Sequence, residues 1–194
     1  MTDKSLYLAG DAEADALLAS DPLALLIAMV LDQQIPMERA FGAPAELRRR
    51  IGGLDAAAIA DMDPSELADA FSKKPALHRF PGSMAARVQQ ACDVVANQYG
   101  GNAARIWEDA SSGADLLTRV ASLPGFGEQK ARIFIGLLGK QFGARPTGWR
   151  KACSPFGDAG TYYSVADITD AASLAKVRAH KQEMKAAAKA ASAK

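Results

Sequence analysis

The segment LPGFGEQKARIFIGLLGKQFG, residues 123–143, combines proline, glycine and basic residues in an order that suits anion binding. Gly125 and Gly127 follow Pro124 and stand directly before apolar residues with helical spacing. Glycine permits tight turns in which a Cβ would be strained or in the way. Backbone N–H groups at the N-terminus of a helix attract negative charge, and a phosphate fits there. The segment therefore predicts a turn that binds a phosphate group.

Basic residues gather in the same half of the chain. The net charge of the 194-residue sequence is only +1, but residues 1–77 contain 7 lysines and arginines against 13 acidic residues, and residues 78–194 contain 16 against 9. Between residues 128 and 151 a single acidic residue stands among six basic ones. A basic face of this kind is typical of proteins that bind nucleic-acid phosphates, although solvated helices have a similar composition.

A second group of polar residues follows the most apolar run of the chain. The run LALLIAMVLDQQI, residues 23–35, predicts a buried central helix because it is apolar nearly all round. Asp21 and Pro22 favour its start, and Pro36 is expected to end it. Its polar end carries Asp32, Gln33 and Gln34. These side chains either take part in chemistry or satisfy backbone groups at the end of the helix.

Almost every other segment predicts a helix, and no segment has a clear strand pattern. Residues 80–101 predict a long helix that ends at a Gly-Gly pair, and residues 113–143 predict two helices joined by a tight turn. The Gly- and Pro-rich stretch after Gly143 predicts a loop with one short helix from Trp149. The Ala- and Lys-rich residues 171–194 favour a C-terminal helix or tail whose last dozen residues fray. We therefore predict an all-α fold.

Length and composition exclude several classes of protein. A chain of 194 residues suffices for one domain with a real core, and 49% hydrophobic with 23% charged residues is ordinary for a globular protein. No apolar run approaches the roughly 20 residues of a membrane span, and the acidic start has no signal peptide, so we expect a cytoplasmic protein. Cys92 and Cys153 cannot form a four-thiolate iron–sulfur or zinc site, and no histidines and carboxylates have metal-ligand spacing.

Three segments follow one another in a recognisable order: DPLALLIAMVLDQQI, FPGSMAARVQQACDVVANQYGG and LLTRVASLPGFGEQKA followed by FG. This order resembles the helix-hairpin-helix base-excision DNA glycosylase superfamily, the group of endonuclease III, the adenine-mismatch glycosylase and the alkyladenine glycosylases. The positions that match the family motifs are Gly82, Ala86, Leu123, Pro124, Gly125, Gly127 and Ala131. The resemblance covers residues 21–145.

The resemblance implies a two-lobed helical domain over residues 1–170 that binds double-stranded DNA as a monomer. Backbone N–H groups of the hairpin would bind a DNA phosphate, and nearby side chains would add sequence-independent contacts. The implied DNA-binding residues are Gly125, Phe126, Gly127, Gln129, Lys130 and Arg132. A sodium or potassium ion would be held by the backbone at Leu123 and Gly125. The four cluster cysteines of the iron–sulfur branch are missing after the core, so no iron–sulfur cluster and no other cofactor is expected.

The resemblance also implies a base pocket between the two lobes. Gln33 or Gln34 would fill the gap left by an extruded nucleotide or touch the flipped base. Three aromatic residues of the divergent C-terminal region could stack on that base, although core packing explains them equally well: Trp149, Tyr162 and Tyr163. His78 is expected at the surface or as a helix cap, with a phosphate contact as the alternative.

Two departures from the family pattern bear on the chemistry. Bifunctional members carry a lysine two positions after the second hairpin glycine, where this chain has Gln129 and only then Lys130. One residue along a helix is a rotation of about 100°, so we expect Lys130 to point elsewhere and expect no Schiff-base lyase activity. The family's catalytic aspartate would lie at residues 147–149, which are Thr, Gly and Trp.

Three aspartates are candidates to replace the missing one: Asp158, Asp32 and Asp167. We place Asp158 first, because its Gly- and Pro-rich loop can bring it over the cleft. The alternative for Asp158 is an ordinary turn residue.

Two functions from different classes follow from these residues. The first is a monofunctional DNA N-glycosylase, a hydrolase that removes a damaged or mispaired base, with a carboxylate that stabilises the sugar cation. The second is a catalytically inactive helix-hairpin-helix module that detects distorted DNA or recruits repair partners. Gln129 and the missing aspartate favour the module. The polar residues 32–34 favour the enzyme, which we prefer because a binding module needs only the hairpin.

Overall fold

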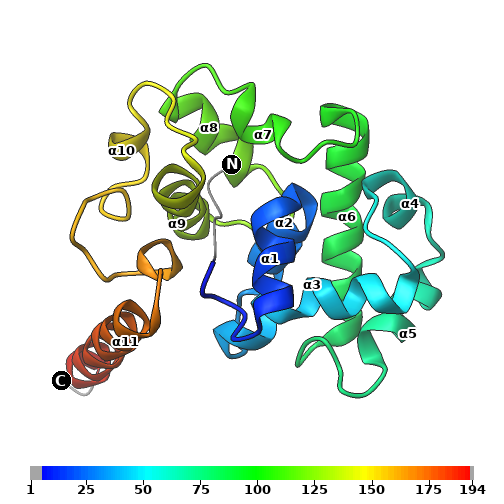
Figure 1. Cartoon of the computed structure of the whole chain (residues 1–194), viewed down its shortest axis with the longest axis horizontal. Coiled ribbons are helices and arrows are strands. Elements are labelled where there is room, and N and C mark those ends of the chain that lie inside the picture. Colours follow the sequence, from blue (N-terminus) through cyan, green and yellow to red (C-terminus); the bar gives the residue numbers. More distant parts are fainter. Residues whose placement is uncertain (1–5, 193–194) are drawn as a thin grey trace.

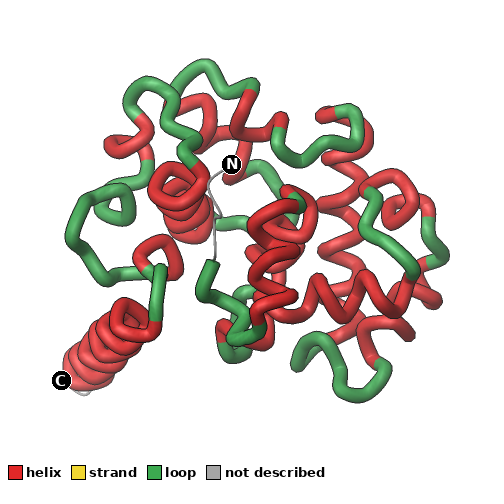
Figure 2. The backbone as a smooth tube through the Cα atoms, in the orientation of Figure 1, coloured by secondary structure: helices red, strands yellow, loops and turns green. Residues whose placement is uncertain are grey.

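The predicted all-α class is confirmed by the computed structural model, which describes residues 6–192. Every regular element among these residues is a helix (Figure 2). The α-helices are α1 (Ala12–Ser20), α2 (Pro22–Leu31), α3 (Met37–Ile51), α4 (Ala56–Asp61), α5 (Pro64–Ser72), α6 (Pro81–Tyr99), α7 (Arg105–Glu108), α8 (Gly113–Ala121), α9 (Glu128–Leu137), α10 (Trp149–Ala152) and α11 (Ala171–Ser192). A π-helical turn η1 (Leu138–Phe142) extends α9, and a 3₁₀ turn η2 (Val165–Asp167) precedes α11.

Helix α2 forms the centre of the core. All residues from Leu23 to Leu31 are buried, and α1, α3 and α6 pack around them (Figure 1). Asp21 caps the helix by accepting the N–H groups of Leu23 and Ala24 at 2.9 and 3.2 Å, and Pro22 occupies the first helical position. A helix that is apolar all round must be covered on every side, so α2 determines where the other helices pack.

The remaining helices form two groups on either side of α2 (Figure 1). Helices α3 to α6 pack together in one lobe, and α7 to α10 pack together with η1 and η2 in the other. Among residues 6–192 no single helix has the length and hydropathy of a membrane span; only α1 and α2 taken together reach both, and they are bent by 114° relative to each other.

Helix α2 ends earlier than the sequence predicts. Its last residue is Leu31, well before Pro36, which instead stands directly ahead of α3. Side-chain donors satisfy the final carbonyl groups of α2, and one of them is the Gln33 amide, which donates to Val30 at 2.8 Å. Gln34 then adopts a left-handed φ of 56°. The polar residues that follow α2 therefore lie in a turn and not on a helix.

The π-helical turn η1 anchors the C-terminal part of the chain. The Gln141 amide donates to the carbonyl oxygens of Ala166 and Ile168, each at 3.1 Å. The Lys140 ammonium forms an ion pair with the buried carboxylate of Asp167. Turns of π-helix are rare and are frequent at functional sites. Here the turn fixes η2, and through η2 the start of α11, against the hairpin lobe.

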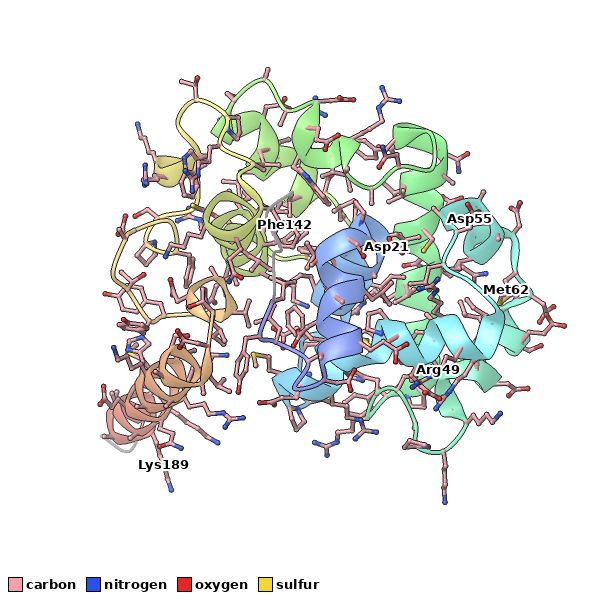
Figure 3. The ribbon with its side chains drawn as sticks, viewed as in Figure 1. Asp21, Arg49, Asp55, Met62, Phe142 and Lys189 are labelled. Atoms are coloured by element: carbon pink, nitrogen blue, oxygen red, sulfur yellow. The ribbon has the colours of Figure 1, made fainter. Side chains whose placement is uncertain are left out.

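Residues 171–192 form one long helix, as the composition favours, and the last two residues of the predicted tail lie outside the described residues. Helix α11 runs from Ala171 to Ser192, and Val177 is its buried contact with the body. Residues 181–191 are exposed. Figure 3 shows Lys189 near the outer end of this helix, away from the rest of the protein. The second half of α11 is therefore a helix with very little packing support.

We predict that Gly139→Ala destabilises the protein. A Cβ at this position would lie 2.3 Å from the indole of Trp149, so the ring must move. The free energy of unfolding should fall by about 1–3 kcal/mol, as for other overpacked sites. Gly42→Ala in α3 is the control, because nothing lies within 4 Å of its Cβ, and it should raise stability by up to about 1 kcal/mol. Urea unfolding followed by circular dichroism would measure both; equal effects would contradict the prediction.

Candidate nucleic-acid interface and active site

The two glycines of the hairpin, Gly125 and Gly127, suit their positions for different structural reasons. Gly125 has a φ of +87°, and a Cβ there would lie 2.8 Å from Arg87 Cδ and 3.3 Å from Val30. Gly125 is therefore required both for the left-handed turn and for close contact with α6 and α2. Gly127 has an extended φ of −97°, and nothing lies within 4 Å of its Cβ position. It keeps the outer side of the turn open at the start of α9.

The outer side of the hairpin offers backbone donors. Gly127 directly precedes α9, whose first N–H groups have no intrahelical partner. No side chain caps this end of the helix, so these N–H groups stay available. Phe126 points inward instead, where its ring lies 5.7 Å from that of Phe134. Arg132 pairs with Glu128 along the helix. The hairpin thus presents N–H groups, the predicted phosphate ligands, on an open face.

Lys130 joins the hairpin to the end of α2. Its ammonium donates to the carbonyl oxygens of Met29 and Val30 at 2.9 and 3.2 Å. Burial lowers the pKa of Lys130 to about 8, and the nearby charge of Asp32 acts in the opposite direction. Gln129, one residue earlier, faces the cavity described below. This difference agrees with the rotation of about 100° between successive helical residues.

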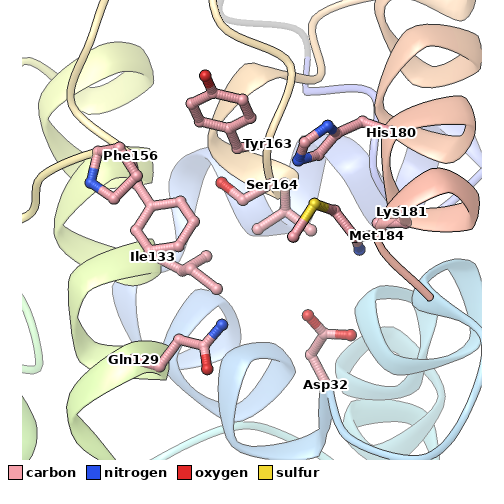
Figure 4. Close-up of a pocket in the computed structure, with 11 residues that line it drawn as sticks. Asp32, Gln129, Ile133, Phe156, Tyr163, Ser164, His180, Lys181 and Met184 are labelled. Atoms are coloured by element: carbon pink, nitrogen blue, oxygen red, sulfur yellow. The ribbon is translucent and has the colours of Figure 1, made fainter. Parts of the chain in front are cut away.

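A cavity of about 580 Å³ lies between the hairpin helix α9, the end of α2 and the C-terminal helix α11. Figure 4 shows Asp32 and Gln129 on one side of it, with Tyr163, His180 and Met184 on the other. Its remaining lining residues are Ile133, Pro155, Phe156, Ser164, Val165 and Lys181. The cavity is therefore bounded by segments far apart in the sequence.

Asp32 is the carboxylate that faces this cavity (Figure 4). Burial raises the pKa of Asp32, and the positive charges of Lys181 and Lys130 lower it, in that order of importance. Within residues 6–192 its carboxylate has no hydrogen-bond or ion-pair partner. A half-buried carboxylate that faces a cavity without a partner is available to a ligand.

The walls of the cavity are positioned by groups outside it. Asp167 accepts the N–H of Tyr163 at 2.8 Å and that of Ser164 at 3.2 Å. Gly136 lets the backbone of Phe156 pack on α9, because a Cβ there would lie 2.8 Å from the Phe156 carbonyl oxygen. Asp167, a candidate catalytic residue from the sequence, is thus occupied in holding the cavity wall.

The glutamine pair after α2 divides into an anchored and an exposed residue. The Gln33 side-chain oxygen accepts from Arg87 at 3.2 Å, and its backbone carbonyl accepts from His78 at 2.8 Å. Gln34 is exposed and is the non-glycine residue with positive φ among residues 6–192. Such a conformation costs about 1–3 kcal/mol and is found at functional sites.

His78 is buried, which corrects the expectation of a surface position. It is 1% exposed, and its Nδ1 accepts the N–H of Phe80 at 3.0 Å while Nε2 donates to Gln33. Burial lowers the pKa of His78 and keeps its ring neutral. The ring therefore holds the turn after α2 against the start of α6.

The other candidates from the sequence lie away from the cavity lining. Asp158 is exposed on the loop after α10. Trp149 is buried on Gly139, with the guanidinium groups of Arg145 and Arg150 at 5.9 and 4.8 Å from its ring. The structure thus brings together Asp32, Gln129 and Tyr163, and leaves Asp158 and Trp149 elsewhere.

Sequence reasoning missed the contribution of α11 to the cavity. His180, Lys181 and Met184 line it, and the rings of His180 and Tyr163 lie 4.8 Å apart. A signal was present: Lys181 follows Val177 and precedes Met184 at helical spacing, so a charged residue interrupts an apolar seam. Such local exceptions are typical of functional positions.

No metal-binding cluster is found within residues 6–192, where no three His, Cys, Asp or Glu side chains group together. Both cysteines are buried, and burial raises the pKa of Cys92 to about 12 and that of Cys153 to about 11. These thiols are protonated at neutral pH and are structural.

The fold and the site define the class of protein: an all-α protein in which a helical hairpin with open N–H groups stands beside a cavity with a half-buried carboxylate. A family model described as "HhH-GPD superfamily base excision DNA repair protein" matches residues 27–194. The chain belongs to this superfamily, which confirms the resemblance seen in the sequence, and it is a base-excision DNA repair protein that binds DNA. Searches of curated proteins and of solved structures gave no significant match.

The two hairpin glycines should respond differently to substitution. Gly125→Ala places a Cβ against Arg87 at positive φ, so the free energy of unfolding should fall by about 1–3 kcal/mol. Gly127→Ala meets nothing within 4 Å and should change it by about 0.5 kcal/mol or less. Chemical denaturation would measure both. A larger loss for Gly127→Ala than for Gly125→Ala would refute this assignment.

The buried neutral ring of His78 predicts a loss of stability in acid. The folded-state pKa is lowered, so below the ordinary value of about 6.5 the unfolded chain takes up a proton first and the free energy of unfolding falls. Urea unfolding at about pH 7 and about pH 5 would show this fall. His78→Gln should reduce the fall, whereas His180→Gln should preserve it. An equal fall in all three proteins would speak against the assignment.

Proposed function

We propose that the protein is a monofunctional DNA N-glycosylase whose reactive carboxylate is Asp32. The observation that supports this most directly is the position of Asp32, half-buried directly after α2 and facing the cavity on the same side as Gln129. Asp158, the first choice from the sequence, lies on an exposed loop and does not line this cavity. The carboxylate role therefore passes from Asp158 to Asp32 in this proposal.

In the proposed reaction a base is extruded from double-stranded DNA into the cavity. The bond between the sugar C1′ and the base nitrogen breaks, a water oxygen bonds to C1′, and a water proton ends on the departing base. The sugar gains positive charge in the transition state, which the Asp32 carboxylate would stabilise. Gln34, exposed and held at positive φ, is suited to fill the gap left in the duplex.

The proposed reaction stops at the abasic site. The position of the family's Schiff-base lysine holds Gln129, whose amide is not a nucleophile. The next residue, Lys130, has its ammonium bonded to the carbonyl oxygens of Met29 and Val30. Neither group supports cleavage of the strand, so we propose a hydrolase without lyase activity.

The hairpin would hold the DNA backbone during this reaction. We propose that a phosphate binds the open N–H groups at the start of α9, and that the protein acts as a monomer. A sodium or potassium ion at the turn is compatible with the backbone there: the Leu123 carbonyl accepts one N–H, from Phe126 at 3.1 Å, and keeps a second lone pair. Such an ion would add positive charge beside the phosphate.

One observation favours the second candidate function, a catalytically inactive DNA-binding module. Residues 147–149, where the family's aspartate is expected, contain no carboxylate, and the Trp149 ring fills the space over Gly139. A protein that only detects distorted DNA needs the hairpin and not a carboxylate in the cavity. The two functions differ in whether a base is released.

Single-turnover incubation with a panel of lesion-containing duplexes would test the proposal. Base release, scored as abasic sites after alkali or heat, should be found for at least one lesion. Asp32→Asn should reduce the rate at least about 100-fold, the scale of losing one transition-state electrostatic contact. The matched control Asp158→Asn should retain the rate of base release of the unmodified chain. Tight duplex binding without release from any lesion would favour the binding module.

The charge of Lys181 should set the pH dependence of base release. Asp32 must be ionised, so the rate should fall as the pH drops through its raised pKa. Lys181→Gln removes a charge that lowers this pKa, so the acid limb should move to higher pH. Lys185→Gln, one turn further along α11, should leave the limb in place. Rates measured at saturating protein would separate this shift of the acid limb from any change in DNA affinity. If the limb of Lys181→Gln does not move, the assigned role of Lys181 is wrong.

A further inference from the structure

We propose that the second half of α11 is a DNA-binding surface, and that its lysines hold the backbone of the strand beside the cavity. This lysine face consists of Lys181, Lys185 and Lys189. The inference rests on DNA binding by the superfamily and not on base removal. It assigns a role to Lys185 and Lys189 of α11, which do not line the cavity and which the proposed base release does not use.

The lysine face is regular and exposed. Its residues recur every four positions, so they lie on one side of the helix and each step advances about 6 Å along its axis. All three are exposed, and within residues 6–192 none forms an ion pair or hydrogen bond. Lys189 lies near the far end of α11 in Figure 3.

The lysine face differs from the basic residues in the first half of α11. Lys176 donates to the Tyr162 hydroxyl at 3.1 Å, and Arg178 pairs with Glu38 of α3. These two contacts, with buried Val177, fasten the helix to the body. The first half is therefore an anchor, and the second half projects from it with lysines that form no ion pair or hydrogen bond to the described part of the chain.

Spacing and charge indicate an anionic ligand. Like charges four residues apart repel and destabilise a helix, and little packing compensates beyond Lys181. From residue 171 to residue 192 the helix has five lysines and arginines against one acid, Glu183, which is about 200° around the helix from Lys181. A polyanion along this face would relieve the repulsion and stabilise the helix.

The position of the face identifies the polyanion as DNA. Lys181 lines the cavity on one side, and Gln129, in the first turn of the hairpin helix, lines it on the other (Figure 4). A strand that places a nucleotide in the cavity and a phosphate on the hairpin N–H groups therefore continues toward α11. There Lys185 and Lys189 would meet its next phosphates as sequence-independent contacts.

Fluorescence anisotropy with the full chain and a labelled duplex carrying an abasic-site analogue would test this surface. Lys185→Gln/Lys189→Gln should raise Kd on the order of ten-fold at about 100 mM salt and make the salt slope shallower by about 1.8, since each lost phosphate contact removes about 0.9. Glutamine favours helix nearly as well as lysine, so α11 should still form.

The matched control is Arg48→Gln/Arg49→Gln, which removes two exposed positive charges from α3 in the other lobe. Figure 3 shows Arg49 and Lys189 far apart. This variant should retain the Kd and salt slope of the unmodified chain.

An unchanged Kd in the lysine variant would overturn the proposal. An acidic protein would then be the partner that fits the lysine face. An equal loss of DNA affinity in both variants would also overturn the proposal, because the loss would then follow from net charge and not from the lysine face. Because binding alone is measured, failure of base release would not affect either outcome.

Discussion

The hydrogen bonds from the Lys130 ammonium to the end of α2 are the interaction on which the site depends. They join the hairpin lobe to the central helix at the place where α2 stops and its polar residues begin. Gly125 makes this junction possible, because only a residue without a side chain fits between Arg87 and Val30 at positive φ. The same junction sets Asp32 and Gln129 on the same side of one cavity.

The apolar character of α2 explains why polar residues are concentrated directly after its end. A helix buried on all sides has no room for a charged side chain along its length, so polar groups first occur where it leaves the core. His78 and Arg87 hold Gln33 in the turn that follows, while Gln34 remains exposed at positive φ. Anchored and exposed polar groups thus stand within a few residues of one another.

The C-terminal part of the chain completes the cavity from the opposite side. Lys140 and Gln141, in the π-turn after α9, hold η2, and Asp167 within η2 holds the backbone of Tyr163. These contacts bring α11 to the cavity, although its second half has almost no packing of its own. Buried polar contacts, and not hydrophobic burial alone, therefore decide where α11 lies.

The sequence by itself determined the all-α class, the central helix, the hairpin and the superfamily, because helical spacing, turn glycines and the order of segments are local properties. It also indicated that Gln129 replaces a lysine. Only the tertiary structure placed Asp32 at the cavity and Asp158 on an exposed loop, turned Lys130 and Phe126 inward, and brought α11 to the cavity. These outcomes depend on interactions between residues as much as 149 positions apart, such as Asp32 and Lys181. No local pattern encodes which distant surfaces will pack together.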